Sequence, residues 1–130
     1  MAVLVTAEDD EDIRMLVARS LRKAGHEVIV TANGADGLAA VREHHPDAVI
    51  TDIDMPYMTG LQLCREIRRD PELRHIPVVV VSGSLDFGDK HALEAGATAI
   101  ISKPVVSGVL LHHLAEVLAH PSQRHGGPLT

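Results

Sequence analysis

The segment AVITDIDMP, residues 48–56, decides the fold. Its first four residues are apolar or β-branched, which favours a short buried strand, and Asp52, Asp54 and Pro56 then favour a loop. Other short apolar runs occur along the chain, at residues 2–6, 27–31, 76–81 and 98–102. We therefore expect five short strands, each ending at polar or turn-forming residues.

Helical patterns separate these strands. Ile13, Leu16, Val17 and Leu21 recur at helical spacing and stop before Gly25. Further helices are expected over residues 35–43, from about residue 60 to residue 70, from residue 86 to Gly96, and over residues 107–119. Parallel strands need such crossover helices and bury both faces of their sheet. The alternation predicts a doubly wound α/β domain, a flavodoxin-like (βα)5 three-layer sandwich whose parallel five-stranded sheet has the order 2-1-3-4-5.

Length, charge and hydropathy bound the function. A chain of 130 residues with 45% hydrophobic content suits one domain, expected over residues 1–119 with a disordered tail at 120–130. Its net charge of -6 disfavours direct binding to nucleic acid. The longest apolar run, residues 76–81, is far below the roughly 20 residues of a membrane span. A lone cysteine, Cys64, forms no internal disulfide, so we expect a soluble, cytoplasmic protein with Cys64 as a core residue.

Polar side chains follow four of the five predicted strands. Ligands of doubly wound sheets bind at the carboxyl ends of the strands, near the point where the strand order reverses. Taken singly, each of these residues would be an ordinary solvated side chain or helix cap, and only their shared position at one edge makes them candidates. The candidate site residues are Glu8, Asp9, Asp52, Asp54, Ser82 and Lys103.

These residue types suit phosphoryl transfer to a carboxylate. Glu8, Asp9 and Asp52 would bring three negative charges together, and a hard divalent cation such as Mg²⁺ or Mn²⁺ would compensate them. Asp52 would then be the nucleophile that forms an aspartyl phosphate. Lys103 supplies a cation and Ser82 a hydroxyl donor for the oxygens of the transferred group.

The same motifs resemble those of response-regulator receiver domains of two-component signalling, across residues 2 to about 119. The acidic segment 5–10 followed by Ile13-Arg14 is similar to the acidic pocket of that family, and 52–56 with Gly60 to its phosphoacceptor loop. Val81-Ser82-Gly83 resembles the switch-hydroxyl segment. Gly96-Ala97 before the fifth predicted strand and Lys103-Pro104 after it resemble the last motif of the family. In that family the peptide bond before the proline is usually cis.

The resemblance implies a role for each matching residue. Asp52 would be the phosphoacceptor, with Ser82 and Lys103 binding the phosphoryl oxygens. Asp9, Asp52 and the backbone carbonyl of Asp54 would bind magnesium, with Glu8 acting through water. A sensor histidine kinase or histidine phosphotransfer protein would be the donor. The domain would be no enzyme beyond catalysing its own phosphoryl transfer and hydrolysis, and with no effector domain after residue 119 it would act by binding unless it is one segment of a larger protein.

Two positions depart from the family pattern. Many members carry an aromatic residue near the end of the fifth strand whose ring turns inward on activation, and Ile100 occupies that position here. Asp54 adds a negative charge at a position that tunes the lifetime of the phosphoryl group in the family. The ring movement is therefore not expected, and the direction of the Asp54 effect stays open.

The last predicted helix indicates a partner surface. Leu110, Leu114, Val117 and Leu118 form a core stripe, while Val106, Val109 and Leu111 add apolar surface outside it. One interpretation is a wide buried stripe. The other is a face formed by the fourth helix, fifth strand and fifth helix that docks a downstream protein or a second copy of the chain after phosphorylation.

Alternative functions fit the sequence less well. A haloacid-dehalogenase-like phosphatase also carries an Asp-x-Asp motif, but its nucleophile normally ends the first strand of the core rather than the third. A pseudo-receiver that binds partners without phosphorylation usually lacks Lys103 or an acidic ligand, and this chain has them all. A flavodoxin-like cofactor binder would need a phosphate loop where Glu8 and Asp9 lie. The pairs His44-His45 and His112-His113 point in different directions on a helix, so a shared metal is not expected.

Overall fold

A computed structural model describes residues 1–83 and 86–119 of the chain. Strands and helices alternate throughout, and one parallel sheet carries the strand order β2-β1-β3-β4-β5. The predicted fold class and strand order are therefore confirmed. The elements are β1 (Val3–Ala7), α1 (Glu11–Lys23), β2 (Glu27–Thr31), α2 (Gly34–His44), β3 (Ala48–Asp52), α3 (Gly60–Arg69), β4 (Val78–Ser82), α4 (Asp86–Ala95), β5 (Ala99–Ser102) and α5 (Ser107–Ala119).

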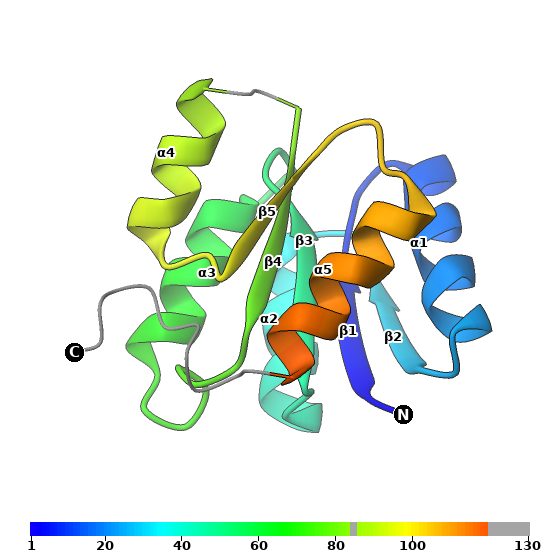
Figure 1. Ribbon diagram of the computed structural model, residues 1–130. Coiled ribbons are helices and arrows are strands. Elements are labelled where there is room, and N and C mark those ends of the chain that lie inside the picture. Colours follow the sequence, from blue (N-terminus) through cyan, green and yellow to red (C-terminus); the bar gives the residue numbers. More distant parts are fainter. Residues whose placement is uncertain (84–85, 120–130) are drawn as a thin grey trace.

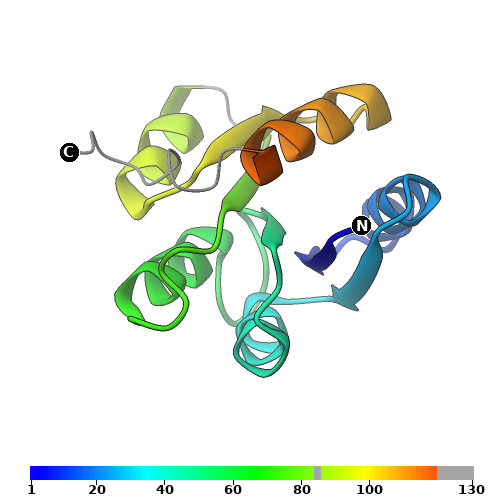
Figure 2. The same ribbon diagram turned by 60° about the horizontal axis from the view of Figure 1, so that its bottom comes forward.

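Helices cover both faces of the sheet in a three-layer arrangement. Figures 1 and 2 show α1 and α5 on one face, with α2, α3 and α4 on the other. Side chains alternate between the faces, so β1 contributes Leu4 to the α1/α5 side and Val5 to the opposite side. Each face holds its own cluster of buried apolar side chains. Cys64 lies fully buried in the larger cluster, as predicted.

Local hydrogen bonds explain where the helices begin. Asp10 caps α1 by accepting a hydrogen bond from the Ile13 amide. Asn33 caps α2 in the same way. Thr59 and Gln62 form a reciprocal capping box at α3, a pattern that the sequence also contains.

Strand boundaries differ from the prediction by one or two residues. β4 begins at Val78 rather than Ile76, because Pro77 has no N–H to donate and the Ile76 carbonyl accepts from Arg68. β1 extends to Ala7, and β4 extends to Ser82. The predicted tail, residues 120–130, lies outside the described part of the chain. Within the described residues, no helix is both long and apolar enough to cross a membrane.

Candidate functional site

Three carboxylates meet at the carboxyl edge of the sheet. The strands reach this edge at the top of Figure 1. Glu8 and Asp9 follow β1, and Asp52 is the last residue of the neighbouring β3. One oxygen from each carboxylate lies within 4.8 Å of the others. Glu8 and Asp52 are buried while Asp9 is exposed, so the cluster opens to solvent on one side. Among the described residues, this is the single group of three or more acidic, histidine or cysteine side chains with such spacing.

Asp52 is held from two directions. Its Oδ1 atom accepts a hydrogen bond from the Ile53 amide at 2.8 Å, and its Oδ2 atom lies 3.1 Å from the Nζ atom of Lys103. Asp52 is 4% exposed and the side chain of Lys103 is 28% exposed, so this ion pair is only partly screened by water. Lys103 follows β5, which means that the contact joins two strands separated by β4.

Ser82 lies between these two strands. It ends β4, pairs in register with Ser102 of β5, and accepts a backbone hydrogen bond from the Lys103 amide at 2.9 Å. Its side chain is buried. Asp54 is exposed in the loop after β3 and does not belong to the carboxylate cluster. The edge therefore brings together Glu8, Asp9, Asp52, Ser82 and Lys103, whereas the Asp54 carbonyl stays a prediction.

Burial and like charge perturb the site. Burial, with a smaller contribution from the nearby Asp52 charge, raises the pKa of Glu8 to about 7. Burial alone would lower the pKa of Lys103, but its hydrogen bond and charge interaction with Asp52, together with Glu8 and Asp9, raise that pKa overall. Three carboxylates within 4.8 Å of one another carry more negative charge than one lysine balances.

Arg14 braces the acidic loop, a role that the sequence analysis did not assign. Its guanidinium donates to the backbone carbonyls of Glu8 at 3.0 Å and Asp9 at 3.2 Å. The Asp10 amide donates to the Glu8 carboxylate at 3.1 Å. An arginine one helical turn after an acidic loop is a weak sequence signal, because most such arginines are solvated.

Close backbone packing fixes the loop after β3. The Gly60 amide donates to the Ile53 carbonyl at 2.7 Å, and a Cβ atom at Gly60 would lie 1.9 Å from the Asp52 carbonyl oxygen. Only glycine fits there, which explains a residue that the sequence analysis matched by pattern alone. The Met58 amide donates a hydrogen bond to the Pro56 carbonyl and closes a tight turn around Tyr57. Tyr57 has a positive φ of 71°, and its side chain is 90% exposed. The loop after Asp52 therefore presents a strained, solvent-facing tyrosine.

The donor set suits a hard divalent cation. Three carboxylates with one open side offer the oxygen ligands that magnesium or manganese prefers, and leave room for water and a further oxygen ligand. The buried nucleophile candidate Asp52 already has a cation at one oxygen and an amide at the other. The edge can thus bind an anionic group that arrives next to Asp52.

Three exposed apolar side chains lie on α4, just before α5 and on α5. Leu93, Val106 and Val109 are exposed, at 61%, 55% and 44% respectively. Leu110, Leu114 and Val117 are buried, which confirms most of the predicted core stripe, and Leu118 packs against it. Ile100 is partly buried and packs against the α2/α3/α4 cluster.

The comparison with protein families matches this chain to the response regulator receiver domain over residues 3–115. Among curated relatives, the polar-differentiation response regulator DivK of Brucella ovis is 38% identical over 107 residues, which cover 81% of this chain and 87% of the relative. DivK of Brucella anthropi is 39% identical over 99 residues, 75% of this chain and 80% of the relative.

Solved structures show the same fold. The chemotaxis response regulator CheY4 of Vibrio cholerae has a TM-score of 0.84 and 29% identity, covering 90% of this chain and 98% of that one. The receiver domain of the sensor histidine kinase PA1611 from Pseudomonas aeruginosa, solved with a magnesium ion coordinated in its active-site cleft, has a TM-score of 0.85 and 23% identity, covering 91% and 98%. Fold, motifs and relatives agree, and the chain belongs to the response-regulator receiver domains of two-component signalling.

Proposed function

We propose that this receiver domain relays a signal by accepting a phosphoryl group on Asp52 from the phosphohistidine of a sensor histidine kinase or a histidine phosphotransfer protein. The observation that carries the proposal is the convergence of Glu8, Asp9, Asp52 and Lys103 at one strand edge. A buried aspartate with an amide on one oxygen and a lysine on the other is oriented for attack.

In the proposed transfer, a carboxylate oxygen of Asp52 attacks phosphorus and forms the new O–P bond. The P–N bond breaks, and the imidazole nitrogen of the donor leaves with the electron pair. The Lys103 ammonium and the Ser82 hydroxyl stabilise the charge on the equatorial oxygens. In the later hydrolysis, water attacks phosphorus, the bond to Asp52 breaks, and inorganic phosphate is released.

Asp9, Asp52 and the Asp54 carbonyl would hold Mg²⁺ or Mn²⁺, with Glu8 acting through water. When bound, the ion supplies positive charge that offsets the carboxylates and the incoming phosphoryl oxygens. The grouping of the Glu8, Asp9 and Asp52 carboxylates around one lysine supports this assignment, because three negative charges exceed what that lysine balances. The magnesium ion described for the PA1611 receiver domain adds support from a protein of the same fold.

The proposed output is binding through the face formed by α4, β5 and α5. Leu93, Val106 and Val109 expose apolar surface there, which suits a downstream protein or a second copy of the chain. With Ile100 at the position of the usual switch aromatic, the signal would travel through the Ser82 and Lys103 ends of β4 and β5 rather than through a ring. We assign this activity to residues 1–119 and place it in the cytoplasm.

Intact mass measurement tests the phosphoacceptor directly. After incubation with acetyl phosphate and magnesium, the wild type should gain one phosphoryl group, and Asp52→Ala should gain none because the attacking oxygen is gone. Asp54→Ala is the matched control, since it keeps the backbone carbonyl and should still be phosphorylated. A chelator should abolish the gain. A wild type that gains no mass under any of these conditions leaves a pseudo-receiver that signals by binding alone.

Sedimentation velocity tests the output face. A beryllofluoride-loaded sample that dimerises, and that Val109→Glu returns to monomer, would support docking of a second copy. Met15→Glu is the control, because Met15 is exposed to a similar extent on α1. Monomers in every state would direct the output to a different protein.

A further inference from the structure

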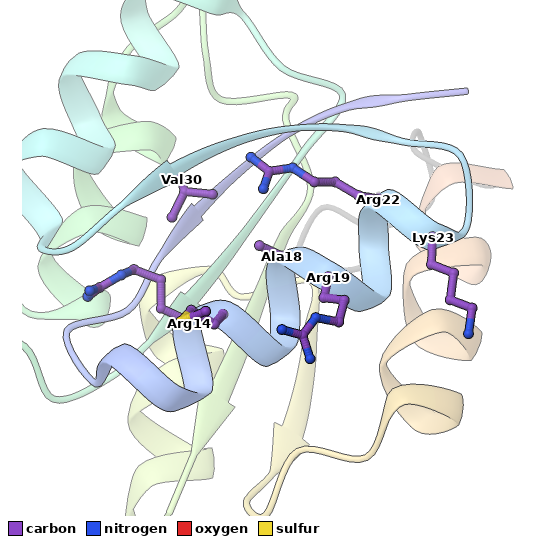
Figure 3. A pocket seen from close by; sticks show the side chains of 7 residues that line it. Arg14, Ala18, Arg19, Arg22, Lys23 and Val30 are labelled. Atoms are coloured by element: carbon purple, nitrogen blue, oxygen red, sulfur yellow. The ribbon is translucent and has the colours of Figure 1, made fainter.

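A groove runs between α1 and the outer strand β2, and it begins at Arg14, next to the acidic loop. Figure 3 shows the side chains that line it: Arg14 and Arg22 extend on the β2 side of α1, and Arg19 and Lys23 project on its other side. Its volume is about 750 Å³. The lining residues are Arg14, Met15, Ala18, Arg19, Arg22, Lys23 and Val30.

The floor of the groove consists of apolar side chains. They are exposed because α1 does not cover the end of β2. Val28, on the same face of β2, is 7% exposed, whereas Val30 is 36% exposed. Met15 is 50% exposed beside it. β2 is the edge of the sheet, so among the described residues no further strand lies beyond this surface.

The rim is basic in a protein whose net charge is -6. It contains four of the chain's 12 lysine and arginine residues, and within the described part of the chain none of them forms an ion pair with a carboxylate. Arg14 and Arg22 donate to backbone carbonyls, and Arg22 thereby covers the outward carbonyl of Val28 on the sheet edge. Arg19 and Lys23 keep their charge available for an external carboxylate.

We propose that this groove docks an acidic amphipathic helix of a partner protein. Apolar side chains of that helix rest on Met15, Ala18 and Val30, and its carboxylates lie beside Arg19 and Lys23. The stretch of α1 from Arg14 to Lys23 is about 14 Å long, which matches roughly two and a half turns of a second helix. The inference stands independently of phosphorylation at Asp52.

Charge and shape favour a protein helix over other anionic partners. Nucleic acid and anionic membranes present extended negative surfaces, which a chain of net charge -6 repels outside the groove. The apolar floor is concave and offers room for a few side chains, not the protruding apolar face that inserts into a bilayer.

Fluorescence anisotropy with a synthetic peptide tests the proposal. The probe is a labelled peptide of about 15 residues with leucines at helical spacing and glutamates on the flanking positions, and its scrambled version has the same charge without the apolar stripe. We expect a dissociation constant on the order of 10–100 micromolar that weakens with added salt. Amide chemical shift changes should cluster in α1 and β2.

Two variants separate the contributions of the rim and the floor. Arg19→Glu with Lys23→Glu should weaken binding at least about tenfold, and Met15→Ser about threefold. The matched control is Arg65→Glu with Arg69→Glu on α3, which changes the net charge by the same amount and should leave affinity within about twofold. Thermal melts verify that all variants are folded. Equal binding of the scrambled peptide, equal weakening by the α3 control, or sedimentation of the protein with phosphatidylserine vesicles in place of peptide binding would each overturn the proposal.

Discussion

Two partly buried cationic side chains lie at opposite ends of the strands, one at the amino ends and one at the carboxyl ends. They differ in the kind of partner that binds them. Arg68, in the last turn of α3, donates to the carbonyls of Gly96, Arg74 and Ile76 and to the Thr98 hydroxyl, at 2.7 to 3.1 Å. Lys103, at the carboxyl edge, contacts the Asp52 carboxylate at 3.1 Å. Arg68 therefore joins several neutral groups that are mostly backbone, while Lys103 depends on one charged side chain.

This difference separates a structural cation from one suited to switching. The acceptors of Arg68 are fixed by the fold and do not change their charge, and burial lowers the pKa of Arg68 without a carboxylate to oppose it. The partner of Lys103 changes charge if Asp52 is phosphorylated, and Lys103 can follow the new oxygens on its flexible side chain. Substitutions near Arg68, at the amino ends of β4 and β5, should therefore change mainly the stability of the protein. Substitutions near Lys103, at the carboxyl ends of the strands, should change mainly the phosphoryl transfer to Asp52.

The largest expected effect comes from Arg68→Met. It leaves four acceptors without their donor at the amino ends of β4 and β5, and we expect the free energy of unfolding to fall by about 3 kcal/mol. Urea unfolding measures the change. Arg69→Met is the control, because its exposed pair with Glu66 should contribute less than about 0.5 kcal/mol. Acetyl phosphate labelling of the folded variant should stay normal, and a loss of labelling would mean that the two edges are not separate.

Gly96→Ala should destabilise the same edge by about 2 kcal/mol. Gly96 has a φ of 100°, which is unfavourable for alanine, and its new Cβ atom would lie 2.7 Å from the Cγ atom of Arg68. Gly25→Ala separates the two causes, because Gly25 has a φ of 97° but no atom within 4 Å of the added Cβ. The difference between the two free energies of unfolding therefore measures crowding against Arg68. If both substitutions cost the same, Arg68 is free to move and is no rigid clamp.

The sequence predicts the two edges to different extents. Site residues at the carboxyl edge could be predicted because parallel strands bring their ends together, so Glu8, Asp52 and Lys103 needed only correct strand assignments. Arg68 could not be predicted, since three of its four partners are backbone carbonyls that carry no residue-type signal. A basic residue in the last helical turn is also expected for an ordinary helix end. For the same reason, the brace from Arg14 to two carbonyls was missed.

Lys103→Met should lower stability by about 1.5 kcal/mol without magnesium, half the effect of Arg68→Met. Asp52 would keep its hydrogen bond from the Ile53 amide but lose the one ion pair that it forms within the described residues. The nearby Glu8 and Asp9 carboxylates would then repel its charge without compensation. Saturating magnesium should recover most of this loss, because the proposed ion replaces the missing charge. Thermal unfolding with EDTA and with magnesium measures both values. Equal stability losses in the two conditions would argue against a metal in this cluster.

Glu8→Gln should stabilise the metal-free protein by about 1 kcal/mol at pH 8. Burial raises the pKa of Glu8 from 4.5 to about 7. Ionised Glu8 therefore lowers the free energy of unfolding, and this destabilisation is absent below pH 4.5, grows as the pH rises, and is complete above pH 7. The stabilisation should therefore disappear as the pH falls to about 4.5, and with magnesium at pH 8 it should reverse. Glu72→Gln, at an exposed position, is the control. A gain that is independent of pH would show that ionisation of Glu8 is not its cause.

The smallest effect is expected from Gly83→Ala, the counterpart of Gly96→Ala beside the other cation. A Cβ atom at Gly83 would lie 3.8 Å from the Cδ atom of Lys103, an ordinary contact distance, so stability should change by less than about 0.5 kcal/mol. The labelling rate with acetyl phosphate should change less than about threefold, because Lys103 keeps room to move. Urea unfolding and timed mass measurement give the two quantities. A cost near that of Gly96→Ala would mean that Lys103 is clamped as rigidly as Arg68, and the switch would then have to lie in the loops around Asp52.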